Sequence, residues 1–258
     1  MVRTHASGLL VTKSHYENSP EYLSKLIRAI LYGYRITNRQ FHDRYHVAHP
    51  PEPGLPARNQ ASRISALCGD IYNNEKFMSY YIFSTIITVL GMDIKDFSIV
   101  IQSDETKELY QFSTTMSVKT IDDMFPDRVD SWITPQAYDN APGDLSKLLR
   151  GVFRAFGITR KGFQECYRNK YAELDKTEKR SSSSRISAFF LSIRNDNKSV
   201  SFYLLESILR VIGYRIVEMM VTLEDRITKE VRQFSTKMSA DEIDADTERH
   251  DVVGIDSL

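Results

Sequence analysis

The chain has 258 residues, and 41% of them are hydrophobic, which is enough to bury two cores of ordinary size. Its 34 Lys and Arg residues balance its 34 Asp and Glu residues. No run of about 18 uncharged apolar residues is present, and the first residues lack the long apolar centre of a signal peptide, so we expect a cytoplasmic protein without a membrane span. Cys68 and Cys166 do not occupy matching positions of the repeated pattern and are predicted to be plain thiols.

One sequence pattern occurs twice in the chain, with an offset of 122 residues. The letters SRISA stand at residues 62–66 and 184–188, and QFST stands at residues 111–114 and 233–236. No gap is needed between these matches. The period is far too long for one unit of a solenoid, so we interpret the pattern as a tandem duplication in which each copy is a domain with its own core.

The duplication predicts a consecutive domain organisation. Residues 1–20 show no firm periodicity and are predicted to be a flexible leader. Residues 21–124 form the first unit, and residues 125–142 form a proline-containing linker. Residues 143–245 form the second unit, and residues 246–258 are predicted to be an acidic tail.

Each unit is predicted to begin with four helices. Apolar residues at helical spacing, such as Leu23 and Leu26, define the first helix. Thr37 and Thr159 suit the N-cap of the second helix, and Gly213 suits a left-handed end of the fourth. The predicted apolar face of the third helix consists of Ile64, Leu67, Cys68 and Ile71 in the first copy, and of Ile186, Phe189, Phe190 and Ile193 in the second.

A β-hairpin is predicted after the four helices of each unit. Residues 97–101 and 216–223 are rich in β-branched side chains, and after a polar break residues 110–113 and 231–235 supply a second strand. A lone hairpin is marginal in water, so the hairpins should pair with each other or with those of another subunit. The predicted fold is therefore α+β and mainly α, with two helical bundles that are each followed by a hairpin, and a homodimer through the hairpins is expected.

The neutral net charge hides a strong segregation of charge along the chain. Residues 23–95 carry 9 Lys and Arg against 5 Asp and Glu, and residues 145–217 carry 15 against 6. Residues 96–144 carry 3 against 10, and residues 218–258 carry 5 against 11. A basic helical part followed by an acidic part is the pattern expected if one face of each domain meets nucleic acid.

Three segments carry a family resemblance. The second copy contains ITRKGFQECY, SSRISAFF and SVSFYLLESILRVIGYRI, and the first contains ITNRQFHDRY, ASRISALC and FMSYYIFSTIITVLGMDI. Each set resembles the Xre or lambda-repressor type of helix-turn-helix domain over about 75 residues. One departure is that about a dozen residues separate the second and third helices, where the family has a turn of a few residues.

The resemblance implies that the third helix of each unit enters the major groove of DNA. The implied base-edge contacts are Arg58, Asn59, Gln60, Ser62 and Arg63 in the first copy, and Arg180, Ser181, Ser182, Ser183, Ser184 and Arg185 in the second. The implied phosphate contacts are Arg39, Arg160 and Lys161 at the start of the second helices, and Lys76 and Lys198 at the start of the fourth.

These features lead to a function hypothesis. We expect a sequence-specific, double-stranded DNA-binding transcription regulator, of the repressor type found in bacteria, phages or mobile elements, with two helix-turn-helix units in one chain. The alternative is an adaptor that uses a helix-turn-helix scaffold to contact a protein partner, such as a toxin, a polymerase or another regulator.

Enzymatic and metal-dependent functions have little support in the sequence. No glycine-rich phosphate loop, repeated His/Cys/acid cluster or nucleophile motif is present, so no enzyme and no cofactor are expected, and only a nuclease is left open. The spacing of His42, His46 and His49 is compatible with a metal, but no metal site is predicted because the second copy does not repeat them. Their counterparts are Gln164, Arg168 and Tyr171.

Overall fold

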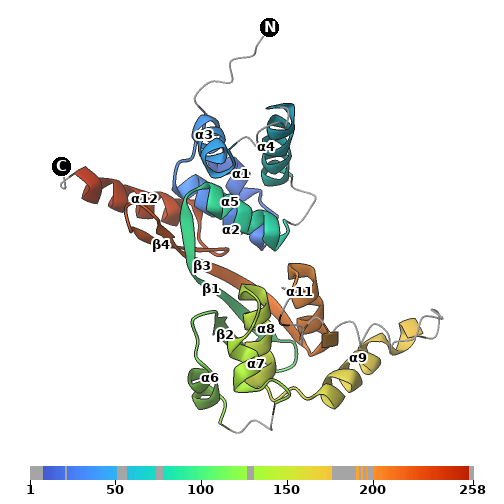
Figure 1. Ribbon diagram of the computed structural model, residues 1–258. Helices are drawn as coiled ribbons and strands as arrows, with labels where there is room; N and C mark the ends of the chain where they lie inside the picture. The colour runs from blue at the N-terminus through green and yellow to red at the C-terminus, as the bar shows by residue number, and fades with distance from the viewer. Residues whose placement is uncertain are drawn as a thin grey trace. The chain divides into compact units, whose positions relative to one another are not determined.

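The computed structural model describes residues 8–20, 22–50, 57–73, 78–126, 131–175, 190–191, 193, 196 and 200–255, without the side chains of residues 57–61, 172–175 and 250–255. The fold is α+β and mainly helical, as predicted (Figure 1). The elements are α1 (Lys13–Glu17), α2 (Leu23–Gly33), α3 (Asn38–Ala48), α4 (Ala57–Tyr72), α5 (Tyr80–Val89), β1 (Met92–Ser103), β2 (Leu109–Ser113), α6 (Val118–Met124), α7 (Pro135–Asp139), α8 (Asp144–Ala155), α9 (Arg160–Asp175), α11 (Phe202–Val211), β3 (Tyr214–Asp225), β4 (Val231–Ser235) and α12 (Ala240–Ile255).

The elements recur along the chain with the same offset as the sequence pattern. The strand pairs β1/β3 and β2/β4, and the helix pairs α1/α7 and α5/α11, have matching bounds in the two copies. Gly91 and Gly213 end α5 and α11 with φ angles of 79° and 83°, in the left-handed region where glycine has no Cβ penalty. The helix end predicted at Gly213 is confirmed.

The four strands form one sheet with the order β2-β1-β3-β4. Each hairpin is antiparallel, with Ile99 opposite Phe112 in one and Val221 opposite Phe234 in the other. The hairpins therefore pair with each other through β1 and β3, which is one of the two arrangements predicted from the sequence.

The chain forms two compact units that are not consecutive in sequence. Unit 1 consists of Met1–Lys95 and Glu218–Leu258, and unit 2 consists of Asp96–Val217. Each unit thus combines the helices of one copy with the hairpin end of the other copy. A strand of 12 residues extends about 40 Å at roughly 3.3 Å per residue, so β1 and β3 can carry the chain out of one bundle and into the other.

In unit 1 the helix α2 is covered by α1, α5, β4 and α12. The ring of Phe234 in β4 lies 5.5 Å from the ring of Tyr34, between centroids. Arg232 donates to the carbonyl oxygen of Gly33 at 3.1 Å, and Thr247 of α12 donates to the same oxygen at 2.8 Å. The C-terminal end of α2, whose last carbonyls have no partner within the helix, is therefore capped by the hairpin and helix of the second copy.

Unit 2 shows the reciprocal arrangement. The ring of Phe112 in β2 contacts that of Phe156, which follows α8, at 5.9 Å between centroids. Asp122 of α6 accepts two hydrogen bonds from Arg154 of α8, at 2.7 and 2.6 Å. A bidentate pair of this kind is charge-assisted and geometrically specific, so it fixes α6 of the first copy on α8 of the second.

The leader that was predicted to be flexible, and the predicted linker, both contain packed helices within the described residues. Leu10 and Val11 are fully buried, and Tyr16 of α1 donates to the carbonyl oxygen of Met238. In the predicted linker, Tyr138 of α7 donates in the same way to Met116, at 2.8 Å. Both α1 and α7 have five residues, which is too short for a helical period to be visible, and tertiary contacts hold them in place.

The segment predicted to be an acidic tail is helical within the described residues. Residues 246–255 belong to α12, and Thr247 is buried against α2. Two carboxylates of α12 have cationic partners in unit 1: Asp246 in this segment contacts Arg232 at 2.8 Å, and Asp244 just before it contacts Arg35 at 2.6 Å.

Two helical glycines provide a matched test of the exchanged hairpin. A Cβ atom at Gly33 would lie 2.7 Å from a ring carbon of Phe234, whereas a Cβ atom at Gly69 of α4 would meet nothing within 4 Å. Gly33→Ala should destabilise the protein by about 1–3 kcal/mol through this clash. Gly69→Ala should stabilise it by about 0.5–1 kcal/mol through helix propensity. Urea unfolding measures both, and equal effects would show that Phe234 does not lie on α2.

The carboxyl group of Asp96 predicts a pH dependence of stability. Burial alone would raise its pKa, but hydrogen bonds from the hydroxyls of Ser113, Ser98 and Thr114 hold the pKa below its usual value. The stabilisation is therefore complete above the unfolded pKa of about 3.9 and disappears as the pH falls through the lower folded pKa.

Asp96→Asn should accordingly lower the free energy of unfolding at neutral pH and have a shrinking effect below about pH 4. Urea titrations at several pH values measure this difference. The exposed Asp123→Asn serves as control. An Asp96→Asn effect that is constant down to about pH 2 would contradict the expectation.

Candidate nucleic-acid interface

Capping hydrogen bonds mark where α3 and α9, the predicted second helices of the two copies, begin. Thr37 accepts a hydrogen bond from the N–H of Gln40 at 3.2 Å, and the Gln40 side chain accepts from the N–H of Thr37 at 2.9 Å, which is a complete capping box before α3. Thr159 accepts from the N–H of Gly162 at 3.0 Å before α9. The two N-caps predicted from the sequence are therefore confirmed.

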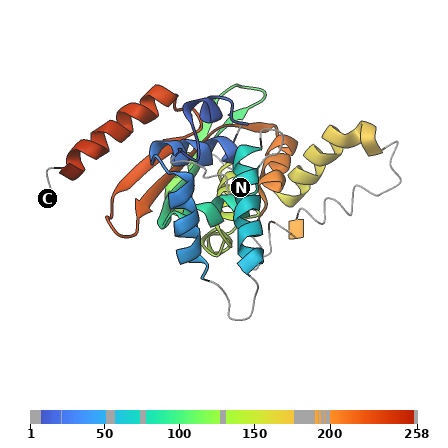
Figure 2. The ribbon, with the colours of Figure 1, turned by 90° about the horizontal axis from the view of Figure 1, so that it is seen from above.

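The helix α4, the predicted third helix of the first copy, exposes one polar face. Ile64 and Ile71 are buried, as predicted, whereas Leu67 and Cys68 are half-buried. Five exposed residues of α4 are small or basic, Ser62, Arg63, Ser65, Ala66 and Gly69, and Tyr72 is exposed at its end. Both views show α4 beside α3 (Figure 1 and Figure 2).

A buried arginine fixes the C-terminal end of α4. Arg28 of α2 is 1% exposed and donates from Nε to the carbonyl oxygen of Ile71 at 2.8 Å, and from Nη1 to that of His15 at 2.9 Å. Burial lowers the pKa of this guanidinium, which nevertheless remains a cation at neutral pH. A cation at the C-termini of two helices is favoured by their dipoles, so Arg28 positions α1 and α4 together.

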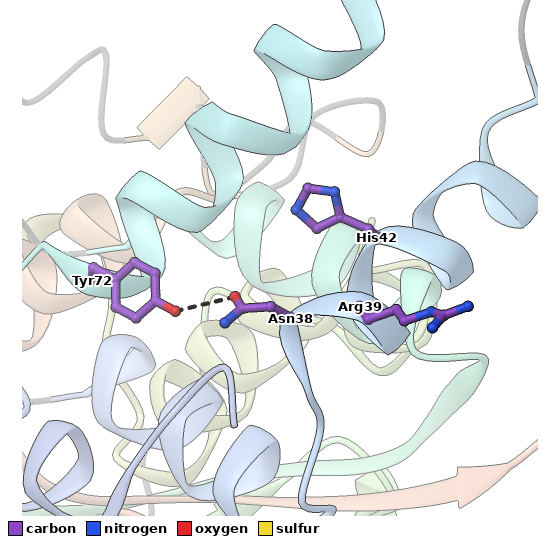
Figure 3. Close-up of a pocket in the computed structure, with 4 residues that line it drawn as sticks. All are labelled: Asn38, Arg39, His42 and Tyr72. Atoms are coloured by element: carbon purple, nitrogen blue, oxygen red, sulfur yellow. Dashed lines mark hydrogen bonds between the residues drawn. The ribbon is translucent and has the colours of Figure 1, made fainter. Parts of the chain in front are cut away.

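A pocket of about 590 Å³ lies where the start of α3 meets the end of α4. It is lined by Asn38, Arg39, His42 and Tyr72 (Figure 3). The Tyr72 hydroxyl donates to Oδ1 of Asn38 at 3.4 Å, while the Arg39 side chain points away from Tyr72. Burial and the nearby Cys68 thiol raise the pKa of Tyr72, so the hydroxyl remains a donor at neutral pH.

Basic side chains at the helix starts are exposed in both units. Arg39 is 91% exposed in its side chain and lies 3.8 Å from Asp43, and Lys161 lies 3.9 Å from Glu165. Such exposed pairs contribute little, so both cations remain available to phosphates. Arg160 is exposed and lies 5.0 Å from the ring of Phe190, which belongs to the predicted third helix of the second copy.

The described residues cover only part of the predicted contact set. Ser62 and Arg63 lie on the exposed face of α4, Arg39 starts α3, and Arg160 and Lys161 start α9. The other predicted contacts lie outside the described side chains: Arg58, Asn59, Gln60, Lys76, Arg180, Ser181, Ser182, Ser183, Ser184, Arg185 and Lys198.

The pocket at α3 and α4 was not anticipated from the sequence. Asn38, His42 and Tyr72 are far apart in the chain or differ between the copies, so the repeat did not single them out. Along α4, Tyr72 lies nine residues, or about 13 Å, from Arg63. Nine residues are about two and a half helical turns, so the side chains of Tyr72 and Arg63 project from opposite sides of α4.

The exchange of hairpins redistributes the charge between the units. Unit 1 contains 16 Lys and Arg against 18 Asp and Glu, and unit 2 contains 18 against 16. In unit 1 the α12 carboxylates pair with cations on the α2 side, such as Lys13, which contacts Asp241 at 2.6 Å. Among the described contacts, none joins a basic side chain of α3 or α4 to a carboxylate of α12.

Within the described residues, no group of three or more His, Cys, Asp or Glu side chains is arranged to hold a metal ion. The rings of His46 and His49 instead contact the ring of Tyr45, at 6.3 and 4.7 Å. Nor does any helix in this part of the chain combine the length and apolar character that crossing a bilayer requires.

Comparisons with models of protein families, with curated proteins and with solved structures found no match. The resemblance to helix-turn-helix proteins therefore rests on the residues quoted from the sequence.

Arg28→Lys tests how the α4 surface is held. Lysine keeps the charge but lacks the planar fork that reaches two carbonyl oxygens, so we expect a loss of roughly 1.5–3 kcal/mol in the free energy of unfolding. Hydrogen exchange of the α4 amides should accelerate more than that of β3. The exposed Arg39→Lys should change stability by less than about 0.5 kcal/mol. Unchanged exchange in α4 would show that Arg28 does not position this helix.

Proposed function

We propose that the protein is a sequence-specific, double-stranded DNA-binding transcription regulator. The observation that carries this proposal is the exposed face of α4, together with the basic start of α3 beside it. The family resemblance, which assigns the same helix to the major groove, supports it independently of the geometry.

The exposed face of α4 suits close approach to base edges. Ser62, Ser65, Ala66 and Gly69 are spaced i, i+3, i+4 and i+7, so they form one stripe along the helix. Small side chains let a helix backbone come near a groove floor, and the serine hydroxyls can donate or accept hydrogen bonds. Arg63 flanks the stripe and has the guanidinium fork that pairs with O6 and N7 of guanine.

The start of α3 suits a phosphate contact beside that helix. Arg39 extends into solvent at the N-terminal end of α3, where the helix dipole also favours an anion. Arg160 and Lys161 take the same role at the start of α9 in unit 2. Phosphate contacts of this kind set the position on DNA and make affinity fall with salt, whereas the α4 contacts set the sequence.

An adaptor function is the second candidate, and one observation favours it. Ile227, at the turn between β3 and β4, is 92% exposed, and Val231 and Leu109 are half exposed on β4 and β2, the edge strands of the sheet. Edge strands with exposed apolar side chains are suited to pairing with another chain, either a partner protein or a second copy.

Arg63→Ala tests the DNA proposal. Sites would first be selected from random duplexes with the wild-type protein, and affinities would then be measured by mobility shift over a salt series. Loss of a bidentate base contact should weaken binding about 10- to 100-fold and relax the preference at one base pair. Arg226→Ala is the matched control, because Arg226 pairs with Asp93 at 2.8 Å on the hairpin and should leave affinity unchanged.

Two outcomes would count against DNA as the ligand. One is the failure of selection to enrich any sequence at low salt. The other is equal weakening by Arg63→Ala and Arg226→Ala, which would indicate a diffuse charge effect. Ile227→Asp discriminates the adaptor function, because it should abolish capture of a protein partner while leaving the selected duplex bound.

A further inference from the structure

Two exposed tyrosines stand at the same place in the two copies. Tyr81 is the second residue of α5 and Tyr203 is the second residue of α11, and the offset between them is that of the repeat. Each tyrosine is 78% exposed, so most of its side chain lies in solvent.

The other residues that α5 and α11 share have structural roles. Packing explains the identities at the buried positions Ile86, Val89, Ile208 and Val211. Just before the helices, Ser79 and Ser201 are the N-caps, and each accepts a hydrogen bond at 3.2 Å from a backbone N–H of the first turn. Tyr81 and Tyr203 neither fill the core nor cap a helix, so the fold does not explain why the two copies share them.

A single exposed aromatic side chain needs no explanation, but the same one at matching exposed positions of two diverged copies does. The other exposed position of these helices is Thr88 in α5 and Arg210 in α11. Exposed apolar residues elsewhere also differ between the copies: Val47 matches Asn169, Met124 matches Asp246, Ile227 matches Glu105, and Leu109 matches Val231.

The backbone that carries each tyrosine is fixed by the same contact in both units. Ser24 of α2 accepts a hydrogen bond from the N–H of Met78 at 3.1 Å. Ser146 of α8 accepts one from the N–H of Val200 at 2.9 Å. Both serines are buried, and both contacts lie directly before an N-cap. The start of each helix is therefore positioned before a partner binds, which lowers the entropic cost of binding.

The surroundings of the tyrosines suit a phosphate. Tyrosine has a neutral hydroxyl that can donate to a phosphate oxygen. The first turns of α5 and α11, which the structure describes in full, carry no acidic residue. Glu206, one turn after Tyr203, contacts Arg210 at 2.6 Å, so its charge is balanced. Two equal contact points need a partner that offers equal acceptors at repeated places, and the phosphate backbone of DNA does so.

We propose that the hydroxyls of Tyr81 and Tyr203 each donate a hydrogen bond to a phosphate of double-stranded DNA. This inference rests on the proposed function and deepens it, because it adds a neutral backbone contact to each unit. Phosphate contacts fix the position on DNA but do not read its sequence. A neutral donor releases no counterion, so the tyrosines strengthen binding without steepening its dependence on salt.

Tyr81→Phe and Tyr203→Phe remove the hydroxyl and keep the ring. Affinities of the full-length variants would be measured by mobility shift over a salt series, with a duplex enriched by the wild-type protein and an unrelated duplex of the same length. Each change should weaken binding to both duplexes about three- to tenfold, and the double variant by about the product. The slope of log affinity against log salt should stay the same, whereas Arg39→Ala should reduce it by about 1.

Tyr110→Phe is the matched control. Tyr110 lies on β2, its hydroxyl donates to Glu108, and its counterpart in the other copy is Arg232. Loss of this hydroxyl should change DNA affinity by less than about twofold. The unfolding midpoints of Tyr81→Phe and Tyr203→Phe in urea should equal that of the wild type, because both side chains are exposed.

The outcomes separate this inference from the proposed function. If the wild-type protein prefers the enriched duplex but the double variant binds both duplexes as tightly as the wild type, the tyrosine contact is overturned and the function stands. Equal weakening by Tyr110→Phe would also overturn the contact. If the wild type binds both duplexes equally and the tyrosine variants still weaken binding, the contact is supported and sequence specificity is rejected. Failure of the wild type to bind any duplex at low salt would overturn both.

Discussion

The docking of each hairpin end onto the helices of the other copy is the constraint on which the fold depends. In unit 1, Phe234 and Arg232 close the end of α2, and in unit 2, Phe112 packs against Phe156 after α8. A helix must bury its apolar stripe against another element of the fold, and in unit 1 α2 buries part of it against β4 and α12. Covering it with strands from elsewhere in the chain makes the two bundles mutually dependent, so the duplicated halves fold as one covalent assembly.

A buried arginine occupies the same repeat position in both units, but its surroundings differ between them. Arg28 and Arg150 make the same bonds to the carbonyl oxygens of two helix ends. In unit 1 Arg28 holds the end of α4, whose polar face is exposed, and the rings of His15 and Tyr72 contact each other. In unit 2 an alanine takes the place of a histidine, and a pocket remains.

The acidic segments act within the protein and not only as a solvated surface. Carboxylates of α12 pair with cations of the α2 side, and Asp122 pairs with Arg154 in unit 2. Each unit is close to neutral overall, so an interface with a polyanion depends on local placement and not on net charge. Arg39 and Arg63 are placed on exposed parts of adjacent helices, which is the local condition that a DNA contact requires.

Local patterns alone determined several features of this protein: the helices α2, α3, α5, α8 and α11, the caps at Thr37 and Thr159, the glycine end at Gly213 and the outward position of Arg63 follow from spacing and capping chemistry. The five-residue helices α1 and α7 could not be predicted from the sequence, because they are too short to show a helical pattern of apolar residues. Only the tertiary structure decided which hairpin covers which bundle. The two copies have equivalent residues at the contact between hairpin and bundle, such as Phe112 and Phe234, so the sequence alone does not show which hairpin packs on which bundle. The course of the long strands β1 and β3 determines that pairing.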